Sequence, residues 1–489
     1  MMETVFIGKG DTMDFLNSAV GAINDFLWTY IIIVVLVGCG LWFTLSTKLV
    51  QLRALPEMVR LLAGDLGRRP SGRKAISSFQ AFCVSTASRV GVGNIAGVAI
   101  AIVAGGPGAV FWMWVIAFIG TATGFVESTL AQIYKIPRGH GLFHGGPAYY
   151  IQNALGQPAV AKLFAVLISV TFGLIYVSVQ ANTIAISMEK AFGIDTWVMG
   201  GILAVLSGAV IFGGIQRIAS FTTFLVPFMA GLYLLIALII VVMHIDQVPA
   251  MFALIIHDAF SPQAAVGGGI GTVILTGIRR GLFSNEAGEG SIPNAAATAH
   301  VTHPVKQGLV QAFGVYVDTW IVCSASAFIV LLTGQYKIGS EITGIALAQD
   351  SLASVFGGGA SALLAVFILL FAFSSVVGNY YYGEINIHFF GKNTRHALFV
   401  YRLAVVAMVF FGCVAAFGLV WNLADLFMAM ICLTNLYAIV RLAPLARIAL
   451  ADYFAQKAAG RNPVFAPSIM PDQHGITAWD AGQFKAEKH

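Results

Sequence analysis

The chain has 489 residues, of which 58% are hydrophobic and only 10% are charged, with a mean hydropathy of +0.84. Soluble domains carry about 25% charged residues, so this composition excludes an ordinary soluble protein and places most of the chain in lipid. The net charge of +5 could indicate an anionic partner such as a nucleic acid. The positions of the basic residues argue against such a partner, because they follow a membrane topology.

Apolar runs of about 20 residues, long enough to cross a hydrocarbon core of about 30 Å, recur along the chain. They predict an all-α polytopic membrane protein with about 11 transmembrane helices. The predicted spans are 27–46, 78–104, 108–134, 160–190, 196–214, 219–244, 264–278, 307–334, 356–388, 397–418 and 421–441.

Basic residues separate onto two sides when successive connections are assigned alternately to the two faces of the membrane. One side has only Lys9, Lys190 and Lys337. The other side has Lys48, Arg53, Arg60, Arg68, Arg69, Arg73, Lys74, Lys135, Arg138, Arg217, Arg279, Arg280, Lys306, Lys392, Arg395 and Arg447. The positive-inside rule then puts the N-terminus outside and the C-terminus in the cytoplasm. We therefore expect a multi-pass protein of the bacterial inner membrane.

The predicted organisation has five parts. Residues 1–26 form an extracytoplasmic N-terminus, and 27–77 form an extra helix followed by an amphipathic segment on the cytoplasmic face. Two five-helix repeats follow at 78–250 and 251–450, and they are inverted relative to each other because five is odd. Residues 451–489, which are polar and contain proline, are expected to form a flexible cytoplasmic tail.

A glycine-rich stretch interrupts the second predicted span at residues 90–97 (VGVGNIAG), with three glycines within seven residues. Glycine weakens a helix by about 1 kcal/mol relative to alanine, so an unwound turn is expected near the middle of the bilayer. Unpaired backbone is tolerated there only where it lines a cavity or binds something. A second cluster, 267–272 (GGGIGT), opens the second repeat. Paired breaks of this kind indicate the binding site of a secondary transporter.

The first break has groups that suit an ion and an amino acid. Free carbonyls can coordinate a hard cation such as Na⁺, and the freed amides of the following half-helix can hold a carboxylate. Asn94 adds a side-chain carbonyl at the same place. Residues 91–96 also fit the dinucleotide fingerprint G-x-G-x-x-G/A, but the next acidic residue is Glu127 and the surroundings are transmembrane. That interpretation is therefore rejected.

Two charged residues lie inside predicted spans and are candidates for gating or coupling. An unpaired charge at this depth costs several kcal/mol, so Arg89 and Asp318 either pair, directly or through water, or each faces an aqueous path. Asp318 or Glu127 could also carry a coupling proton in place of Na⁺.

Further polar side chains mark an inward stripe on later spans. Ser374 and Ser375 offer two hydroxyls, and Asn379 lies one helical turn beyond Ser375 on the same face. Gln180 gives a weaker signal of the same kind. The segment 284–304 is too polar to span and is expected to be a cytoplasmic loop with a short helix.

Motifs of other function classes are missing from the sequence. It has no P-loop, H-E-x-x-H, G-x-S-x-G or Cys/His ligand cluster. This argues against an ATP-driven pump and an enzyme, and predicts no catalytic residue, no cofactor and no metal other than Na⁺. A channel would need a continuous polar pore, whereas the polar groups here gather at the two breaks.

Several motifs together resemble the alanine/glycine:cation symporter family, the sodium:alanine symporters of the amino acid–polyamine–cation superfamily. They are 105–115 (GGPGAVFWMWV), 90–97 (VGVGNIAG), 145–150 (GGPAYY), 280–288 (RGLFSNEAG), 317–319 (VDT) and 380–384 (YYYGE). The similarity covers residues from about 30 to about 450. It implies the leucine-transporter fold, a 5+5 inverted repeat, with one extra N-terminal helix. It also implies sodium-coupled uptake of small neutral amino acids such as alanine and glycine.

The segment 90–94 also resembles the broken first helix of the neurotransmitter:sodium symporters. There, carbonyls before the break and hydroxyls on the eighth core helix hold Na⁺. The sodium-binding positions that this resemblance implies are Ala87, Val90, Ser374 and Ser375. The predicted substrate-binding residues are Gly91, Val92, Gly93, Asn94, Gln180, Gly271, Thr272 and Asn379.

Two residues depart from the family pattern. Alanine-selective members have a small residue where this chain has Arg89, and a tryptophan where it has Asn379. An amide in place of an indole widens the pocket and makes it polar, so glutamine or asparagine are candidate substrates beside alanine. A proton-coupled or glutamine-preferring symporter remains the alternative. The expected partners are the amino acid, Na⁺ and membrane lipid, and the expected oligomeric state is a monomer.

Overall fold

The computed structural model of the chain describes residues 17–65, 75–139, 141–213, 215–261, 271–391 and 394–479, without the side chains of 215–223. The described chain is almost entirely helical. One short antiparallel pair joins β1 (Ile136–Pro137) to β2 (Phe143–His144). The predicted all-α class is confirmed. Of the predicted glycine cluster at 267–272, residues 267–270 lie outside the described residues.

A helix over Asn17–Ser46 opens the described chain and contains a π-helical turn, η1 (Trp28–Ile32), followed by α2 (Ile33–Ser46). The other helices of the first half are α3 (Val50–Arg53), α4 (Leu55–Gly64), α5 (Ser78–Arg89), η2 (Gly93–Gly97), α6 (Val98–Gly105), α7 (Ala109–Ile133), α8 (Pro147–Asn153), α9 (Pro158–Val170), η3 (Thr171–Tyr176), α10 (Val177–Phe192), α11 (Thr196–Ile211), α12 (Ile215–Met243) and α13 (Val248–Ala259).

The second half of the chain contains both short and very long helices. They are α15 (Thr272–Asn285), α16 (Ile292–Ala296), α17 (Pro304–Val315), η4 (Tyr316–Cys323), α18 (Ser324–Thr333), α19 (Gly344–Phe356), α20 (Gly359–Phe389), α21 (Arg395–Val414), α22 (Phe417–Ala458) and η5 (Pro467–Ile469).

Eight of these described helices are long and apolar enough to cross a membrane, and a ninth span is formed by a bent pair. The pair is Ser78–Arg89 and Gly93–Gly105, which meet at 51°. This bend lies where the glycines of 90–97 predicted it. Two further apolar helices, Thr196–Ile211 and Val248–Ala259, are shorter, so the count of about 11 spans stays a prediction.

Two predictions from the sequence are wrong, one about where the first helix begins and one about the burial of a segment. The first helix already runs from Asn17 rather than from residue 27. The segment 284–304, expected to be a polar loop, contains the predicted short helix but is buried: Glu286 and Glu289 are 2% and 0% exposed. Its carboxylates accept hydrogen bonds inside the protein, Glu286 from Ser88 and Ser291 and Glu289 from Tyr176, which allows their burial. In the described second half the interruption of the helix therefore lies between α15 and α16.

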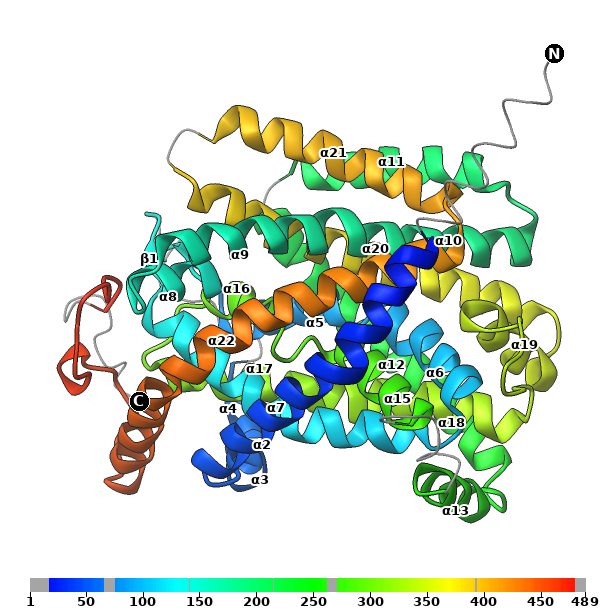
Figure 1. Cartoon of the computed structure of the whole chain (residues 1–489), viewed down its shortest axis with the longest axis horizontal. Helices are drawn as coiled ribbons and strands as arrows, with labels where there is room; N and C mark the ends of the chain where they lie inside the picture. The colour runs from blue at the N-terminus through cyan, green and yellow to red at the C-terminus, as the bar shows by residue number, and fades with distance from the viewer. Residues whose placement is uncertain are drawn as a thin grey trace.

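The long helices pack in layers around α7, α15 and α20 (Figure 1). α7 lies against α15 and α17, while α20 lies against α5, α9 and α10. α11 and α21 pair on the outer side of α10. The helix Asn17–Ser46 and α22 cross the front of the view. This arrangement surrounds both helix breaks with protein rather than lipid.

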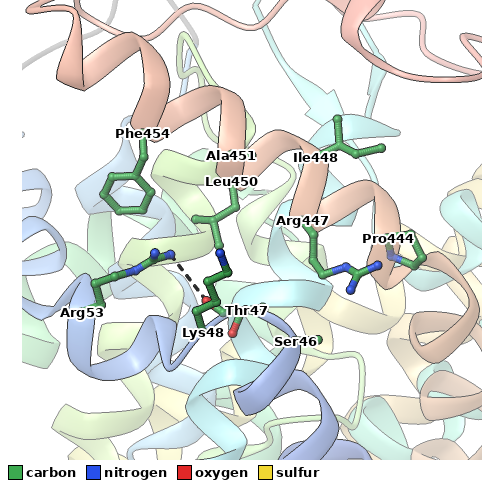
Figure 2. Close-up of a pocket in the computed structure, with 10 residues that line it drawn as sticks. All are labelled: Ser46, Thr47, Lys48, Arg53, Pro444, Arg447, Ile448, Leu450, Ala451 and Phe454. Atoms are coloured by element: carbon green, nitrogen blue, oxygen red, sulfur yellow. Dashed lines mark hydrogen bonds between the residues drawn. The ribbon is translucent and has the colours of Figure 1, made fainter.

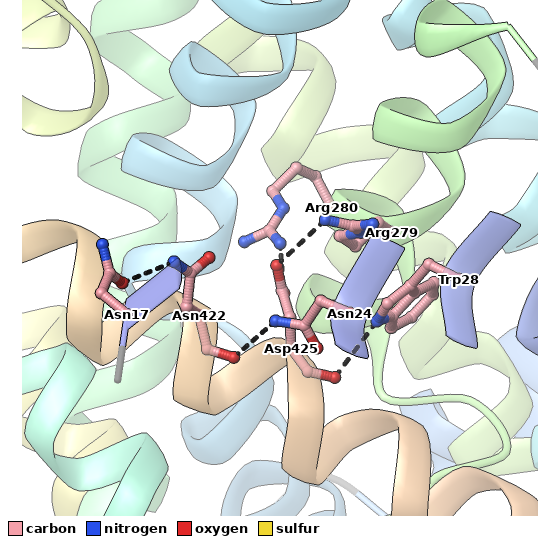
Figure 3. A network of polar contacts seen from close by, with 7 residues as sticks. All are labelled: Asn17, Asn24, Trp28, Arg279, Arg280, Asn422 and Asp425. Atoms are coloured by element: carbon pink, nitrogen blue, oxygen red, sulfur yellow. Dashed lines mark hydrogen bonds and ion pairs between the residues drawn. The ribbon is translucent and has the colours of Figure 1, made fainter. Parts of the chain in front are cut away.

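A polar network ties the start of the first helix to α22 and α15 (Figure 3). Asn422 donates to Asn17 Oδ1 over 2.8 Å, and Asn24 donates to the Asn422 carbonyl over 2.8 Å. Trp28 Nε1 donates to the Asp425 carbonyl over 3.2 Å. The two helices thus begin side by side.

Asp425 in this network is paired with two arginines of α15. It binds Arg280, which is 4% exposed, and Arg279 at 3.5 Å. The alternating assignment of connections predicts Arg279 and Arg280 on the cytoplasmic side. They lie instead within a helix, beside the start of the first helix. Because these two charges are largely buried and share an ion pair with Asp425 inside the protein, they carry no information about the membrane side.

The region that follows α22 is packed against the protein as far as Trp479, so the expectation of a flexible tail from residue 451 is wrong for 451–479. Trp479 is 3% exposed and donates from Nε1 to the Gln132 carbonyl over 3.0 Å. Its ring packs on Phe465, with ring centroids 5.0 Å apart, and lies 4.7 Å from Lys135 Nζ.

The other end of the first helix is joined to α22 through Glu57 of α4. Glu57 accepts from Tyr453 over 2.5 Å, from Arg60 over 3.0 Å and from Lys457. Burial alone would raise the pKa of the Glu57 carboxyl, but the hydrogen bonds and positive charges of Lys457 and its neighbours lower it below its usual value. Lys457 and Arg60 therefore share one negative charge at this end.

We predict that Asp425→Ala destabilises the protein by about 3–5 kcal/mol, because it leaves the buried Arg280 charge without a partner. The measurement is the melting temperature of the purified protein in detergent. Asp350→Ala is the matched control: the Lys190–Asp350 pair is 33% and 41% exposed, and such pairs contribute about 0–1 kcal/mol. Equal melting temperatures for the two variants would contradict this role of Asp425.

Candidate functional site

The first helix break follows from how α5 begins and ends. Ser77 and Gln80 form a capping box that fixes its start. Its last hydrogen bond runs from Val90 N–H to the Thr86 carbonyl over 2.7 Å, and Val90 has an extended backbone. Helical structure resumes at Gly93 in η2. The intervening backbone groups need other partners.

Side-chain carbonyls supply these partners. The Gly91 amide donates to Asn94 Oδ1 over 2.9 Å, and the Val92 amide donates to Gln180 Oε1 over 3.1 Å. All four residues are nearly or fully buried. Gly91 is needed for this approach, since a Cβ there would lie 2.2 Å from Ser375 Oγ. The break thus presents amides that currently bind neutral oxygens and could bind a carboxylate.

Asn94 also connects the break to the buried Asp318. Its Nδ2 donates to Asp318 Oδ1 over 2.6 Å. Asp318 Oδ2 accepts from Ser284 over 2.7 Å and from Thr319 over 2.9 Å. The carboxylate is therefore held by three hydrogen-bond donors from three segments.

Arg89 does not form the predicted direct pair with Asp318. It is 2% exposed, and its guanidinium donates to Gln311 Oε1 over 3.3 Å and to the carbonyls of Gln311 and Ser85 over 3.5 and 3.4 Å. Gly314 makes room for it, since a Cβ there would lie 2.3 Å from Arg89 Nη2. Asp318 already has its donors, so direct pairing is wrong in this structure.

Five oxygen atoms gather where α5 ends against α20. Ser375 Oγ lies 2.8 Å from the Ala87 carbonyl, 3.4 Å from that of Val90 and 3.2 Å from that of Phe371. Ser374 Oγ lies 2.7 Å from the Phe371 carbonyl. All these residues are buried. The structure brings together the four oxygen positions predicted for sodium and adds the Phe371 carbonyl, which sequence reasoning missed. Its signal is its position one helical turn before Ser375.

The second break contributes a carboxylate that sequence reasoning did not single out. Glu286 ends α15 with φ +57°, a left-handed conformation that costs a non-glycine residue about 1–2 kcal/mol. Ser88 donates to Glu286 Oε1 over 2.8 Å, and Ser291 donates to Oε2 over 2.5 Å. Strain of this kind gathers at functional sites. The signal in the sequence was the polar run around Glu286.

Ser88 joins the two breaks to α20. Its hydroxyl lies 2.5 Å from Asn379 Oδ1 as well as beside Glu286. Asn379 is fully buried, and its Nδ2 has no hydrogen-bond partner among the residues that the structure describes. A buried donor without a partner is rare, so Asn379 has the capacity to bind a further acceptor.

Aromatic side chains cover the first break from one side. A Cβ on Gly93 would lie 3.0 Å from the Phe283 ring. The Phe283 ring centroid lies 4.9 Å from those of Tyr176 and Trp421. These rings exclude water from the polar groups beneath them.

Two predicted substrate residues lie elsewhere. Gly271 is the residue before α15, and the Thr272 carbonyl packs 3.4 Å from where a Cβ on Gly105 would lie. Gly105 ends α6, about 18 Å along the helix from Gly93. The structure therefore brings Gly91, Val92, Gly93, Asn94, Gln180 and Asn379 together without Gly271 and Thr272.

The architecture and the paired breaks define the class: a multi-pass membrane transporter with the leucine-transporter fold. The fold is similar to that of MhsT in complex with L-phenylalanine, with a TM-score of 0.55 at 12% identity, covering 83% of this chain and 94% of that chain. At such low sequence identity, the structural similarity shows a shared fold and does not indicate a shared function.

The family follows from sequence. The model of the sodium:alanine symporter family matches residues 13–467, and the chain belongs to this family. The probable sodium/glutamine symporter GlnT of Bacillus subtilis is 49% identical, over 97% of this chain and 98% of the relative. The putative sodium/proton-dependent alanine carrier protein YrbD of the same organism is 44% identical, over 92% and 95%. The protein is thus a transporter of the amino-acid symport class and not an enzyme.

We predict that Gly91→Ala lowers amino-acid uptake about 10-fold to 100-fold, because the new methyl would displace Ser375 and Gln180, at an overpacking cost of about 1–3 kcal/mol. Initial uptake rates in proteoliposomes measure it. Gly97→Ala is the control, since its Cβ would meet nothing closer than 3.8 Å. If both alanine variants transport alike, close packing at Gly91 is not required.

Proposed function

We propose that this protein is a sodium-coupled symporter that imports small neutral amino acids by alternating access. The alanine/glycine range and glutamine are the substrate candidates. The observation that carries the proposal is the five-oxygen cluster at the first break. It lies beside amides that suit a substrate carboxylate, so one short segment can hold both the ion and the amino acid.

The chemistry of the cluster supports Na⁺. Hard cations prefer oxygen ligands, including carbonyls. Three backbone carbonyls and two serine hydroxyls offer a neutral set of this kind, drawn from the end of α5 and the middle of α20. An ion bound here would add a further link between two helices that already contact each other through Ser375 and through Ser88 and Asn379. This supports a role for Ala87, Val90, Phe371, Ser374 and Ser375 in coupling.

The groups around the breaks support a zwitterionic substrate. The amides of Gly91 and Val92 can exchange Asn94 and Gln180 oxygens for a carboxylate, with help from the helix dipole. The Glu286 carboxylate, held by two hydroxyls, provides negative charge for an ammonium group. Asn379 lies next to Glu286, because the Ser88 hydroxyl contacts both side chains. Its free amide donor suits the side-chain carbonyl of glutamine.

The energetics require no ATP site. A tenfold Na⁺ gradient with 100 mV supplies about 3.7 kcal/mol per ion. At about 1.4 kcal/mol per tenfold, one ion supports an accumulation of several hundred-fold. We place the protein as a monomer in a bacterial inner membrane. Its C-terminus is assigned to the cytoplasm, because most basic residues other than Arg279 and Arg280 lie in connections on that side.

Uptake of radiolabelled alanine into proteoliposomes tests this function. We expect uptake to require an imposed Na⁺ gradient, to fail with a matched choline gradient and to be competed by excess unlabelled glutamine. Uptake driven by an imposed proton gradient without Na⁺ would contradict sodium coupling and favour the alternative, in which Asp318 or Glu127 carries the proton. Counterflow exchange separates a carrier from a channel.

Asn379→Trp provides the specificity control for the same assay. An indole at this buried position removes the amide and fills the space beside Ser88. Alanine uptake should persist while glutamine competition weakens. Unchanged competition by glutamine would show that Asn379 does not widen the pocket.

The sodium site has its own test. Ser375→Ala and Ser374→Ala should raise the Na⁺ concentration for half-maximal uptake by about tenfold or more, as loss of a supporting metal contact does. Ser178→Ala is the control, because its buried hydroxyl also donates to a carbonyl three residues back, that of Ile175 at 2.6 Å. Equal sodium dependence in all three variants would remove the oxygen cluster from the proposal.

A further inference from the structure

A cavity of about 520 Å³ lies between the segment that follows the first helix and the last third of α22 (Figure 2). Its volume falls within the range of about 300–1,000 Å³ that is usual for small-molecule sites. Three of its ten lining residues are basic, namely Lys48, Arg53 and Arg447, and none of the ten is acidic. The cavity is distant in the sequence from both helix breaks.

The side chains of Lys48 and Arg447 have no hydrogen-bond or ion-pair partner within the part of the chain that the structure describes. This contrasts with Lys457 and Arg60 nearby, which share the Glu57 carboxylate. Lys48 and Leu49 both have a left-handed backbone, with φ +56° and +54°. This tight turn after the first helix holds Lys48 at the cavity.

Arg53 is fixed in place. It donates from Nη2 to the Thr47 carbonyl over 3.5 Å, and its guanidinium lies 5.2 Å from the centre of the Phe454 ring. Pro444, Ile448, Leu450 and Phe454 give the α22 wall an apolar surface. The cavity thus combines cationic side chains with an apolar wall, the combination that a lipid needs and a free phosphate does not.

The depth of the cavity agrees with a lipid headgroup. The first helix and α22 start together at the Asn17–Asn422 bond. From there, Lys48 lies about 46 Å and Arg447 about 38 Å along the chain at 1.5 Å per residue. A bilayer is about 40–45 Å thick including its headgroups, so the cavity lies at the far headgroup layer. The distribution of basic residues along the sequence predicts that this side of the membrane is cytoplasmic. Anionic lipids of the cytoplasmic leaflet attract basic side chains.

We propose that this cavity binds the phosphate headgroup of an anionic phospholipid, with Lys48 and Arg447 as its charge partners, Arg53 as an oriented donor and the α22 wall against the first part of an acyl chain. The site lies where the first helix, which is additional to the ten-helix core that the family resemblance implies, ends against α22. A bound lipid would hold these two helices together at this end, as the Asn17–Asn422 contact does at the other.

The test is lipid binding to the purified, delipidated full-length protein in detergent, followed by native mass spectrometry. Phosphatidylglycerol should bind more than tenfold tighter than phosphatidylcholine, and its binding should weaken with added salt. The double substitution K48Q/R447Q should weaken phosphatidylglycerol binding about 30-fold, or about 2 kcal/mol at 1.4 kcal/mol per tenfold. The charge-preserving K48R/R447K should retain it.

Lys162→Gln is the matched control, since Lys162 is an exposed lysine in the first turn of α9 and does not line the cavity. Equal loss in K162Q and K48Q/R447Q, or no loss in the double variant, would overturn the proposal. Displacement of the lipid by an equal concentration of inorganic phosphate would overturn the assignment to a lipid. Unchanged melting temperatures in phosphatidylcholine establish that the variants fold, and these outcomes do not depend on transport.

Discussion

The structure depends on one constraint: backbone polar groups inside a membrane must find partners within the protein. Where α5 stops and where α15 stops, side chains meet this need. Asn94 and Gln180 accept from the amides of the first break, and the second break is buried among residues that bind one another. The helices around α7 and α20 keep lipid away from both places. Unwound backbone is thereby available for binding at the centre of the protein.

The two breaks are linked rather than independent. Ser88, next to the first break, contacts Glu286 of the second and Asn379 of α20. Asn94 reaches η4 through Asp318. A ligand that replaces any of these partners changes hydrogen bonds on several helices at once. This is the property that alternating access requires, because occupancy of the site must alter how one group of helices packs on another.

The ends of the protein are held by charges of different kinds. Buried Asp425 pairs with both Arg279 and Arg280 at the end where the first helix starts. At the other end, Glu57 pairs with Lys457 and Arg60, while Lys48 and Arg447 face a cavity. A count of basic residues along the sequence gives each one the same weight, so it cannot distinguish the paired residues from the unpaired ones. The difference matters, because a paired buried arginine stabilises packing whereas an unpaired one at the headgroup layer can bind a lipid.

The sequence by itself determined the membrane class, the helical architecture and the first break. These follow from local properties: apolar length, glycine content and helical spacing. Only the tertiary structure decided that 284–304 is buried, that Ser88 links Glu286 to Asn379, that Thr272 packs at the far end of α6, and that Arg89 binds Gln311. The physical reason is that a polar side chain can be satisfied by water or by a distant segment, and local sequence does not distinguish the two.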